Sequence, residues 1–161
     1  MSSMKKYELT EETKVIGGKT LFRIRALRSF GDIKAGDLGG FIENERNLSH
    51  EGNAWVSGDA RVEDNARVDG DAWVDGNAQV SGDGLINSNN DYLCEKGLGS
   101  HNRSASFFKC KDGHIHVLCG CFDGNLDEFE NKVKKEHGNS KYAKEYLGFI
   151  EVVKTHFEVC Q

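Results

Sequence analysis

The stretch NARVDGDAWVDGNAQV, residues 65–80, repeats one pattern every six residues, with alanine and valine two positions apart. On an extended chain, side chains two positions apart point to the same side, so both residues face one interior. The positions between these pairs hold mostly Gly, Asp, Asn and Ser, which favour tight turns. Each repeat is therefore predicted to be a short strand followed by a turn. The inward positions are Ala54, Ala60, Ala66, Ala72 and Ala78, with Val56, Val62, Val68, Val74 and Val80.

A period of six residues also predicts how the repeats are arranged. Three strands and three turns close one coil of eighteen residues, so residues eighteen apart stack about 4.8 Å from one another as parallel neighbours. The hairpins of a β-sandwich do not recur every six residues, which sets that alternative aside. The open ends of so short a coil must be covered. The stretch TKVIGGKTLFRIRAL, residues 13–27, predicts a hairpin turned at Gly17 and Gly18 that supplies one cover.

The second half of the chain has a different pattern. Strands are predicted near residues 92–95, 105–111 and 114–119. Two helices follow: the first begins with a capping-box-like pair, Asn125 and Glu128, and stops at Gly138. We therefore expect three parts, namely an N-terminal hairpin and cap over residues 1–46, the repeat over 47–88 and an α+β domain over 89–161.

Three short motifs carry a resemblance to a known family: GDLGGFIE at residues 36–43, NLS at 47–49 and NAWV at 53–56. They resemble hexapeptide-repeat proteins of the YdcK type, many of which are encoded by phages and prophages. The motifs GCFDGNLDEFENKV and HGNSKYAKEY are similar to a C-terminal domain of several of those proteins. The resemblance implies that the coil is left-handed, and it implies no settled activity. The predicted fold is thus mainly β with an α+β tail: a short left-handed parallel β-helix, a hairpin cap and a small α+β domain.

The two tryptophans of the chain, Trp55 and Trp73, are eighteen residues apart in the outward position between alanine and valine. They are predicted to form an exposed aromatic ladder, which is costly to leave in water. Three surfaces remain candidates to cover it: the chain's own terminal segments, a second copy, and a ligand or partner. We expect a homo-oligomer with the two tryptophans at its interface.

Composition narrows the function classes. The formal net charge is −5, and Asp69, Asp71 and Asp75 contribute to an acidic face on the repeat, which would repel nucleic acid. No apolar run reaches the roughly 20 residues of a membrane span, and the N-terminal residues lack the apolar core of a signal peptide. The five cysteines are an odd number and are expected to be reduced thiols. The expected location is the cytoplasm of a bacterial host cell, without membrane or direct nucleic-acid contact.

The segment GLGSHNRSASFFK, residues 97–109, is the best candidate for ligand binding. Backbone N–H groups at glycines, a guanidinium and nearby aromatic rings suit an anionic or nucleotide-like ligand. No helix follows the glycines, so neither a P-loop nor a dinucleotide fingerprint applies, and an ordinary surface loop is the alternative. The candidate ligand-binding residues are Ser100, His101, Asn102, Arg103, Lys111 and Phe122.

The segment CKDGHIHVLCGC, residues 110–121, raises the question of a metal site. On one strand His114 and His116 share a face, whereas Cys119 and Cys121 have the opposite parity, so four ligands do not converge. Small buried thiols beside a solvated histidine pair are therefore expected, with neither a metal nor a cofactor.

An enzyme is not expected. The repeats of residues 53–82 contain no histidine base of the kind that hexapeptide acyltransferases use, and no nucleophile with an adjacent base is evident. The leading hypothesis is a non-enzymatic phage-type protein that inhibits a bacterial defence system, either by sequestering a nucleotide-like ligand or by blocking an effector protein. A structural self-assembly module is the alternative, and a hexapeptide acyltransferase-like enzyme is a weaker one.

Overall fold

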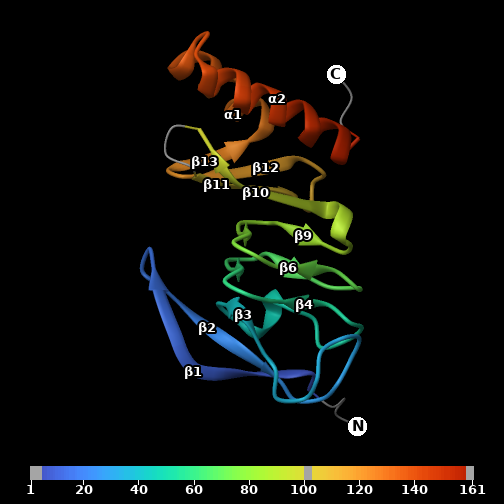
Figure 1. Ribbon diagram of the computed structural model, residues 1–161. Helices are drawn as coiled ribbons and strands as arrows, with labels where there is room; N and C mark the ends of the chain where they lie inside the picture. The colour runs from blue at the N-terminus through green and yellow to red at the C-terminus, as the bar shows by residue number, and fades with distance from the viewer. Residues whose placement is uncertain (1–4, 100–102, 159–161) are drawn as a thin grey trace.

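The computed structural model describes residues 5–99 and 103–158 and is mainly β (Figure 1). The strands are β1 (Tyr7–Ile16), β2 (Lys19–Ala26), β3 (Leu38–Ile42), β4 (Trp55–Val56), β5 (Arg61–Val62), β6 (Arg67–Val68), β7 (Trp73–Val74), β8 (Gln79–Val80), β9 (Leu85–Ile86), β10 (Tyr92–Leu98), β11 (Arg103–Lys109), β12 (Ile115–Cys119) and β13 (Phe122–Asn125). The helices are α1 (Leu126–His137) and α2 (Lys141–His156), with short 3-10 turns at Glu45–Asn47 and Asn89–Asp91.

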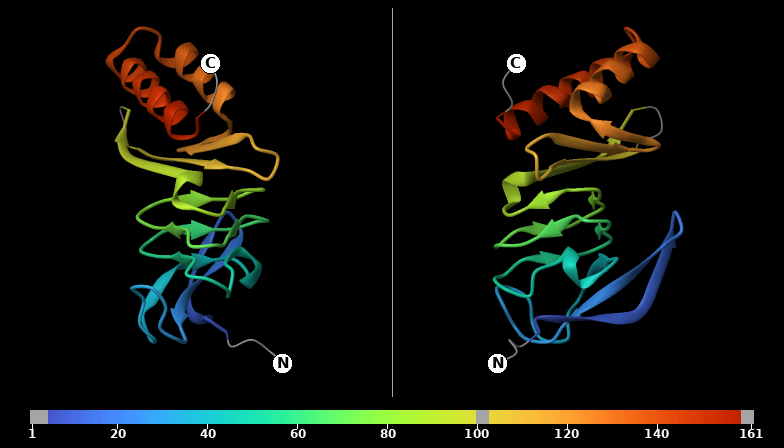
Figure 2. Two further views of the ribbon diagram at one scale, coloured as in Figure 1. Left: turned by 90° about the vertical axis from the view of Figure 1, so that its right-hand side faces the viewer. Right: turned by 180° about the vertical axis from the view of Figure 1, so that it is seen from behind.

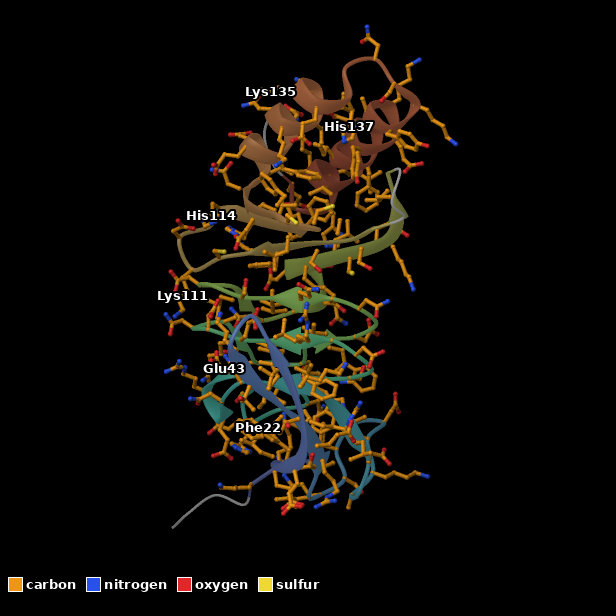
Figure 3. All side chains as sticks on the ribbon, turned by 90° about the vertical axis from the view of Figure 1, so that its left-hand side faces the viewer. Phe22, Glu43, Lys111, His114, Lys135 and His137 are labelled. Atoms are coloured by element: carbon orange, nitrogen blue, oxygen red, sulfur yellow. The ribbon has the colours of Figure 1, made fainter. Side chains whose placement is uncertain are left out.

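The elements are stacked along one long axis (Figure 2). The hairpin β1–β2 lies at one end and the two-residue strands β4 to β9 lie in the middle. The antiparallel sheet β10-β11-β12-β13 follows, and α1 and α2 cover its outer face. In Figure 3, Phe22 and Glu43 lie in the N-terminal part, His114 lies at the level of this sheet, and Lys135 and His137 lie in the helical layer.

The predicted pairing of residues eighteen apart is confirmed. Parallel pairs join Trp55 to Trp73, Arg61 to Gln79 and Arg67 to Leu85. The turns stack as well, because the N–H groups of one turn donate to the carbonyls of the next, as Asp59 does to Gly76 at 3.1 Å. The predicted hairpin at Gly17 and Gly18 is also confirmed, since β1 and β2 pair antiparallel on both sides of it.

The predicted left-handed parallel β-helix is wrong. The strands form four small sheets and not the long continuous parallel sheets of a solenoid: a mixed sheet β1-β2-β3-β5-β8, the sheet β10–β13, and the pairs β4-β7 and β6-β9. The reason is that each repeat commits only two residues to a strand and each side receives only two repeat strands. The N-terminal hairpin, predicted to be a separate cap, instead extends one side through antiparallel β2-β3 and parallel β3-β5 pairing.

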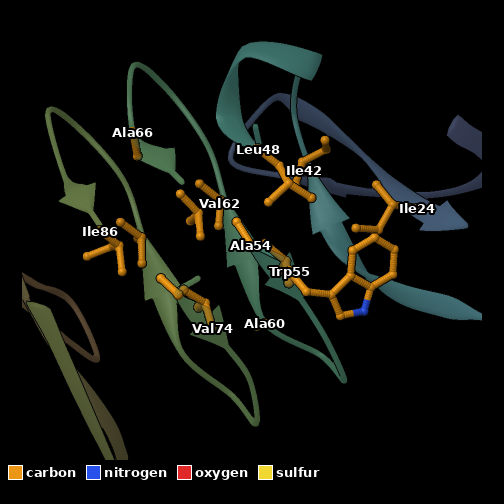
Figure 4. Close-up of a cluster of buried hydrophobic side chains, with 14 of the residues drawn as sticks. Ile24, Ile42, Leu48, Ala54, Trp55, Ala60, Val62, Ala66, Val74 and Ile86 are labelled. Carbon is orange, nitrogen blue, oxygen red and sulfur yellow. The ribbon is translucent and has the colours of Figure 1, made fainter. Parts of the chain in front are cut away.

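The interior of the repeat is filled by its small and aliphatic residues (Figure 4). The alanines and valines of the pattern are at most 1 % exposed. Each alanine directly follows a turn, and each valine lies in a two-residue strand. The side chains that recur every six residues therefore pack together in one close-packed column. Phe108 of β11 belongs to the same cluster, so the core continues from the repeat into the C-terminal sheet.

The predicted exposed ladder of Trp55 and Trp73 at an oligomer interface is wrong for Trp55, which is buried. Its side chain is 1 % exposed, because the N-terminal segment covers it: the ring of Phe30 lies 5.2 Å away and that of Tyr7 lies 6.4 Å away, both edge-on. Trp73 is only half-buried, and its main chain accepts a hydrogen bond from the Tyr92 hydroxyl at 2.5 Å. The first candidate cover, the chain's own terminal segment, is therefore the one found over Trp55.

The N-terminal end of the column is closed by a buried lysine and a histidine. Lys6 is fully buried, and its Nζ donates to the carbonyl oxygen of Ala54 at 2.5 Å and to those of Glu51 and Gly52 at 3.4 Å. His50 stacks on Tyr7 at 4.1 Å and accepts the Lys6 backbone N–H at 3.1 Å through Nδ1. These bonds satisfy carbonyl groups that would otherwise be buried without a partner.

Lys6 should make stability depend on pH. Burial, followed by the nearby charge of Arg28, lowers the pKa of Lys6 to about 8. Between pH 8 and 10.5 the unfolded chain keeps a proton that the folded chain has released, so the free energy of unfolding should rise with pH, by at most about 1.4 kcal/mol per pH unit. Urea unfolding of the wild type and of Lys6→Met at several pH values measures this. The difference between the two should change across that interval, and parallel profiles would contradict the expectation.

The C-terminal part forms as its local signals predict, with one addition. The Asn125 side chain accepts the N–H of Glu128 at 2.8 Å, Glu128 accepts that of Asn125 at 3.1 Å, and α1 ends at Gly138 with a positive φ of 55°. The addition is the edge strand β13. The sheet joins the repeat through an antiparallel bridge between Gly84 and Cys110, and the Lys111 N–H donates to the Asp83 carbonyl at 3.0 Å.

Candidate functional site

A pocket of about 240 Å³ lies between the C-terminal sheet and the helices. It combines aromatic rings with a small number of polar side chains, which is typical of sites for small molecules. Its lining residues are Cys119, Cys121, Phe122, Phe129, Lys132, Val133, Glu136, His137 and Tyr146. Among the predicted ligand residues whose side chains the structure describes, Phe122 is the one that lies in this pocket.

The walls of the pocket are aromatic because three elements each direct rings into it. Phe122 of β13 and Phe129 of α1 lie 5.1 Å apart between ring centroids. Tyr146 of α2 meets Phe129 edge-on at 5.7 Å, and its other side is stacked on His137 at 5.7 Å with an interplanar angle of 26°. These mutual contacts fix the rings in place, so the surface they present to a ligand is largely preformed.

One cation stands at the rim of the pocket. The Lys132 side chain is 46 % exposed, and its Nζ lies 5.8 Å from the Phe122 ring centroid. The same Nζ lies 3.5 Å from Glu136 Oε1, one turn further along α1. An exposed pair of this kind is weak, so the ammonium can exchange its carboxylate partner for an anionic group of a ligand at little cost.

The glycine-rich loop begins next to the pocket. The Gly99 N–H donates to Glu145 Oε1 at 2.6 Å, and the Tyr146 hydroxyl donates to the Leu98 carbonyl at 3.4 Å. Gly99 has a φ of 75°, and a Cβ atom there would lie 2.2 Å from the Tyr146 hydroxyl oxygen. Only glycine fits this approach, which explains one glycine of the motif. Of the predicted ligand residues, Ser100, His101 and Asn102 lie outside the described residues, and for Arg103 only the main chain, at the start of β11, is described.

Lys111 does not belong to this pocket, which corrects its prediction as a partner of Phe122. It lies in the turn that joins β11 to β12, beyond the pair Lys109–Ile115, whereas Phe122 pairs with Cys119 at the other end of β12. The four residue steps from Ile115 to Cys119 span about 14 Å of strand. The prediction failed because the sequence did not show which end of the hairpin each residue would occupy.

The three aspartates of the predicted acidic face lie at two different corners of the repeat. Asp69 and Asp71 flank the turn at Gly70, whereas Asp75 begins the next turn, after β7. Asp71 Oδ1 accepts the Asn53 N–H at 3.3 Å, and Asp75 Oδ1 accepts the Tyr92 hydroxyl at 3.4 Å. Asp71 therefore joins neighbouring turns and Asp75 joins the repeat to β10, and the three carboxylates are spread over two corners instead of one face.

The cysteine- and histidine-rich segment divides between the two faces of the sheet, as strand parity predicts. Cys119 packs toward the helices, while Cys110 packs toward the repeat. The turn after β11 folds Cys110 back beside His114 and His116, which strand parity alone does not predict. The spacing C-x3-H-x-H was the available signal. Burial, with smaller contributions from Asp112 and Asp83, raises the pKa of the Cys110 thiol to about 11.

Comparison with known proteins adds no assignment. No protein-family model matches this chain, and no curated protein matches it. The resemblance to hexapeptide-repeat proteins of the YdcK type therefore stays a prediction.

Proposed function

We propose that this protein is a non-enzymatic binding protein that sequesters a small, planar, anionic ligand of nucleotide-like chemistry in the pocket between β13, α1 and α2. The observation that carries the proposal is the aromatic wall of Phe122, Phe129 and Tyr146 with Lys132 at its rim. A planar base stacks on such rings with about 1–3 kcal/mol for each base, and an ammonium at the rim suits a phosphate.

The size of the site agrees with this class of ligand. A volume of about 240 Å³ is below the range of pockets that bury a whole drug-sized molecule, so it suits one planar group of the ligand, with the anionic part extending toward the rim. The described part of the glycine-rich segment reaches Tyr146 at Leu98, whose carbonyl accepts the Tyr146 hydroxyl, and at Gly99, whose N–H is bonded to Glu145.

The biological part of the proposal rests on the resemblance to phage-encoded proteins. A phage-type protein that removes a nucleotide-like signal in the cytoplasm of its host would inhibit a defence system that depends on that signal. In the part of the chain that the structure describes, neither helix is long and apolar enough to cross a membrane.

Titration calorimetry with nucleoside monophosphates and their 3′,5′-cyclic forms tests the proposal. At least one of them should bind with a Kd below about 100 µM. Phe122→Ala should weaken that binding about tenfold or more through lost stacking. Lys132→Ala should weaken it about tenfold, because one charge-assisted contact is lost.

The matched control is Lys135→Ala, which removes an equal charge from an exposed position of the same helix outside the pocket lining. Its affinity should equal that of the wild type. Chromatography of the released ligand should recover the unchanged compound. The proposed site would be refuted if no compound of the panel binds, or if the Phe122 and Lys132 variants bind as tightly as the wild type. A chemically altered ligand would refute the non-enzymatic role.

A further inference from the structure

A cluster of one thiol and two imidazoles lies on the face of the C-terminal sheet opposite the pocket. Cys110 is 4 % exposed and stands at the bridge to Gly84 of the repeat, whereas His114 and His116 are half-buried. The ligand atoms of the three side chains all lie within 4.8 Å of one another. The turn is held tightly, since the Cys110 N–H donates to the His114 carbonyl and the Gly113 N–H donates to the Cys110 carbonyl, both at 2.9 Å.

The outward-facing nitrogen of each imidazole is held by a carboxylate. His114 Nδ1 lies 2.5 Å from Asp112 Oδ1, and His116 Nε2 lies 2.5 Å from Asp123 Oδ1. A carboxylate is an acceptor, so these two nitrogens carry the N–H. The inward-facing nitrogens of the neutral rings, His114 Nε2 and His116 Nδ1, therefore present lone pairs to each other across 3.2 Å.

Two facing lone pairs repel unless a proton or a metal ion lies between them. A metal ion held tetrahedrally by two imidazole nitrogens at 2.0–2.1 Å would set those nitrogens about 3.3 Å apart, close to the 3.2 Å observed. Histidine ligands of metals commonly donate their other N–H to a carboxylate, which fixes the ring and makes it a stronger donor. Asp112 and Asp123 stand in that relation to the two rings, and their negative charges also favour a dication.

We propose that Cys110, His114 and His116 form a binding site for a zinc ion. One sulfur and two imidazole nitrogens are the donor types that zinc prefers, and three protein ligands leave the fourth tetrahedral position to water or an external ligand. The ion would join the β11–β12 turn to the end of the repeat through Cys110. The site is independent of the pocket, because its residues lie on the other face of the sheet.

Titration of metal-free protein with Zn²⁺, and with Co²⁺ as a spectroscopic probe, tests the site. One Zn²⁺ should bind per chain, and the Co²⁺ form should show a thiolate-to-cobalt charge-transfer band. Cys110→Ser should abolish that band. His116→Ala should weaken Zn²⁺ binding at least about 100-fold, and Asp123→Asn about 10- to 100-fold, because the latter removes only the partner that orients His116.

Matched controls separate the cluster from other thiols and acids. Cys94→Ser and Asp127→Asn remove the same groups elsewhere in the C-terminal part, and both should bind Zn²⁺ and Co²⁺ as the wild type does. Circular dichroism establishes that each variant is folded, and His114→Gln, at a half-buried position, replaces Cys110→Ser if that variant fails to fold. Less than one Zn²⁺ per chain at saturation, a Co²⁺ spectrum without the thiolate band, or unchanged affinity in His116→Ala would overturn the proposal.

Discussion

Trp55→Ala is expected to destabilise the protein by about 3–4 kcal/mol, which would lower its urea midpoint strongly. The indole is 1 % exposed and fills the space between the repeat and the N-terminal segment, so its removal leaves a cavity lined by Tyr7 and Phe30. The loss is slightly below that of the largest aromatic truncations, because Trp55 Nε1 has no hydrogen-bond partner among the described residues and removing it relieves an unsatisfied donor. Equilibrium urea unfolding followed by circular dichroism measures the change.

The paired tryptophan supplies the control. Trp73 has the same chemistry and lies opposite Trp55 in the parallel pair, but it is only half-buried. Its main-chain bonds survive truncation, so Trp73→Ala should cost no more than about 1.5 kcal/mol. Equal losses in the two variants would mean that the N-terminal segment does not cover Trp55 in solution.

Gly39→Ala should cost about 3 kcal/mol, at the upper end for overpacked positions. An added Cβ would lie 2.5 Å from the Val56 carbonyl oxygen, 2.6 Å from Ile24 Cγ1 and 2.7 Å from Trp55 Cζ2. Strand β3 is paired on both sides, with β2 and β5, so its backbone cannot move away from all three atoms. The measurement is the free energy of unfolding in urea.

Gly148→Ala is the matched control, because an added Cβ in the middle of α2 would meet nothing within 4 Å. Alanine favours a helix over glycine, so this variant should be more stable than the wild type by about 0.5–1 kcal/mol. The two glycine substitutions should therefore have opposite signs. A stabilising or neutral Gly39→Ala would show that β3 does not approach the tryptophan so closely.

The parts of the fold that follow from local rules could be predicted from the sequence. The period of six residues predicts the pairing of Trp55 with Trp73, and the residues Asn125 and Gly138 predict both ends of α1. The fold class could not be predicted in the same way. Strand sharing between the N-terminal hairpin and the repeat depends on long-range pairing of β3 with β5, and no local period records it.

In the candidate sites, too, local features could be predicted from the sequence and long-range placement could not. Phe122 lines a pocket, but Lys111, its predicted neighbour there, lies at the far end of the hairpin, because sequence distance does not tell which end of a strand a residue occupies. Lys132 was missed, since on a charged helix it looks like its exposed neighbours until β13 is placed beside it. The cluster around Cys110 was missed because strand parity says nothing about a cysteine that a turn folds back onto its neighbour strand.

The bridge between Gly84 and Cys110 also sets a limit on how copies of this chain can assemble. A stack of parallel turns with a bare last turn would accept another chain end to end and grow into a filament. Here the turn after β11 occupies that edge, with the Lys111 N–H on the Asp83 carbonyl, so the column has a fixed length. This end of the column is therefore closed, and another chain is not expected to add to it end to end.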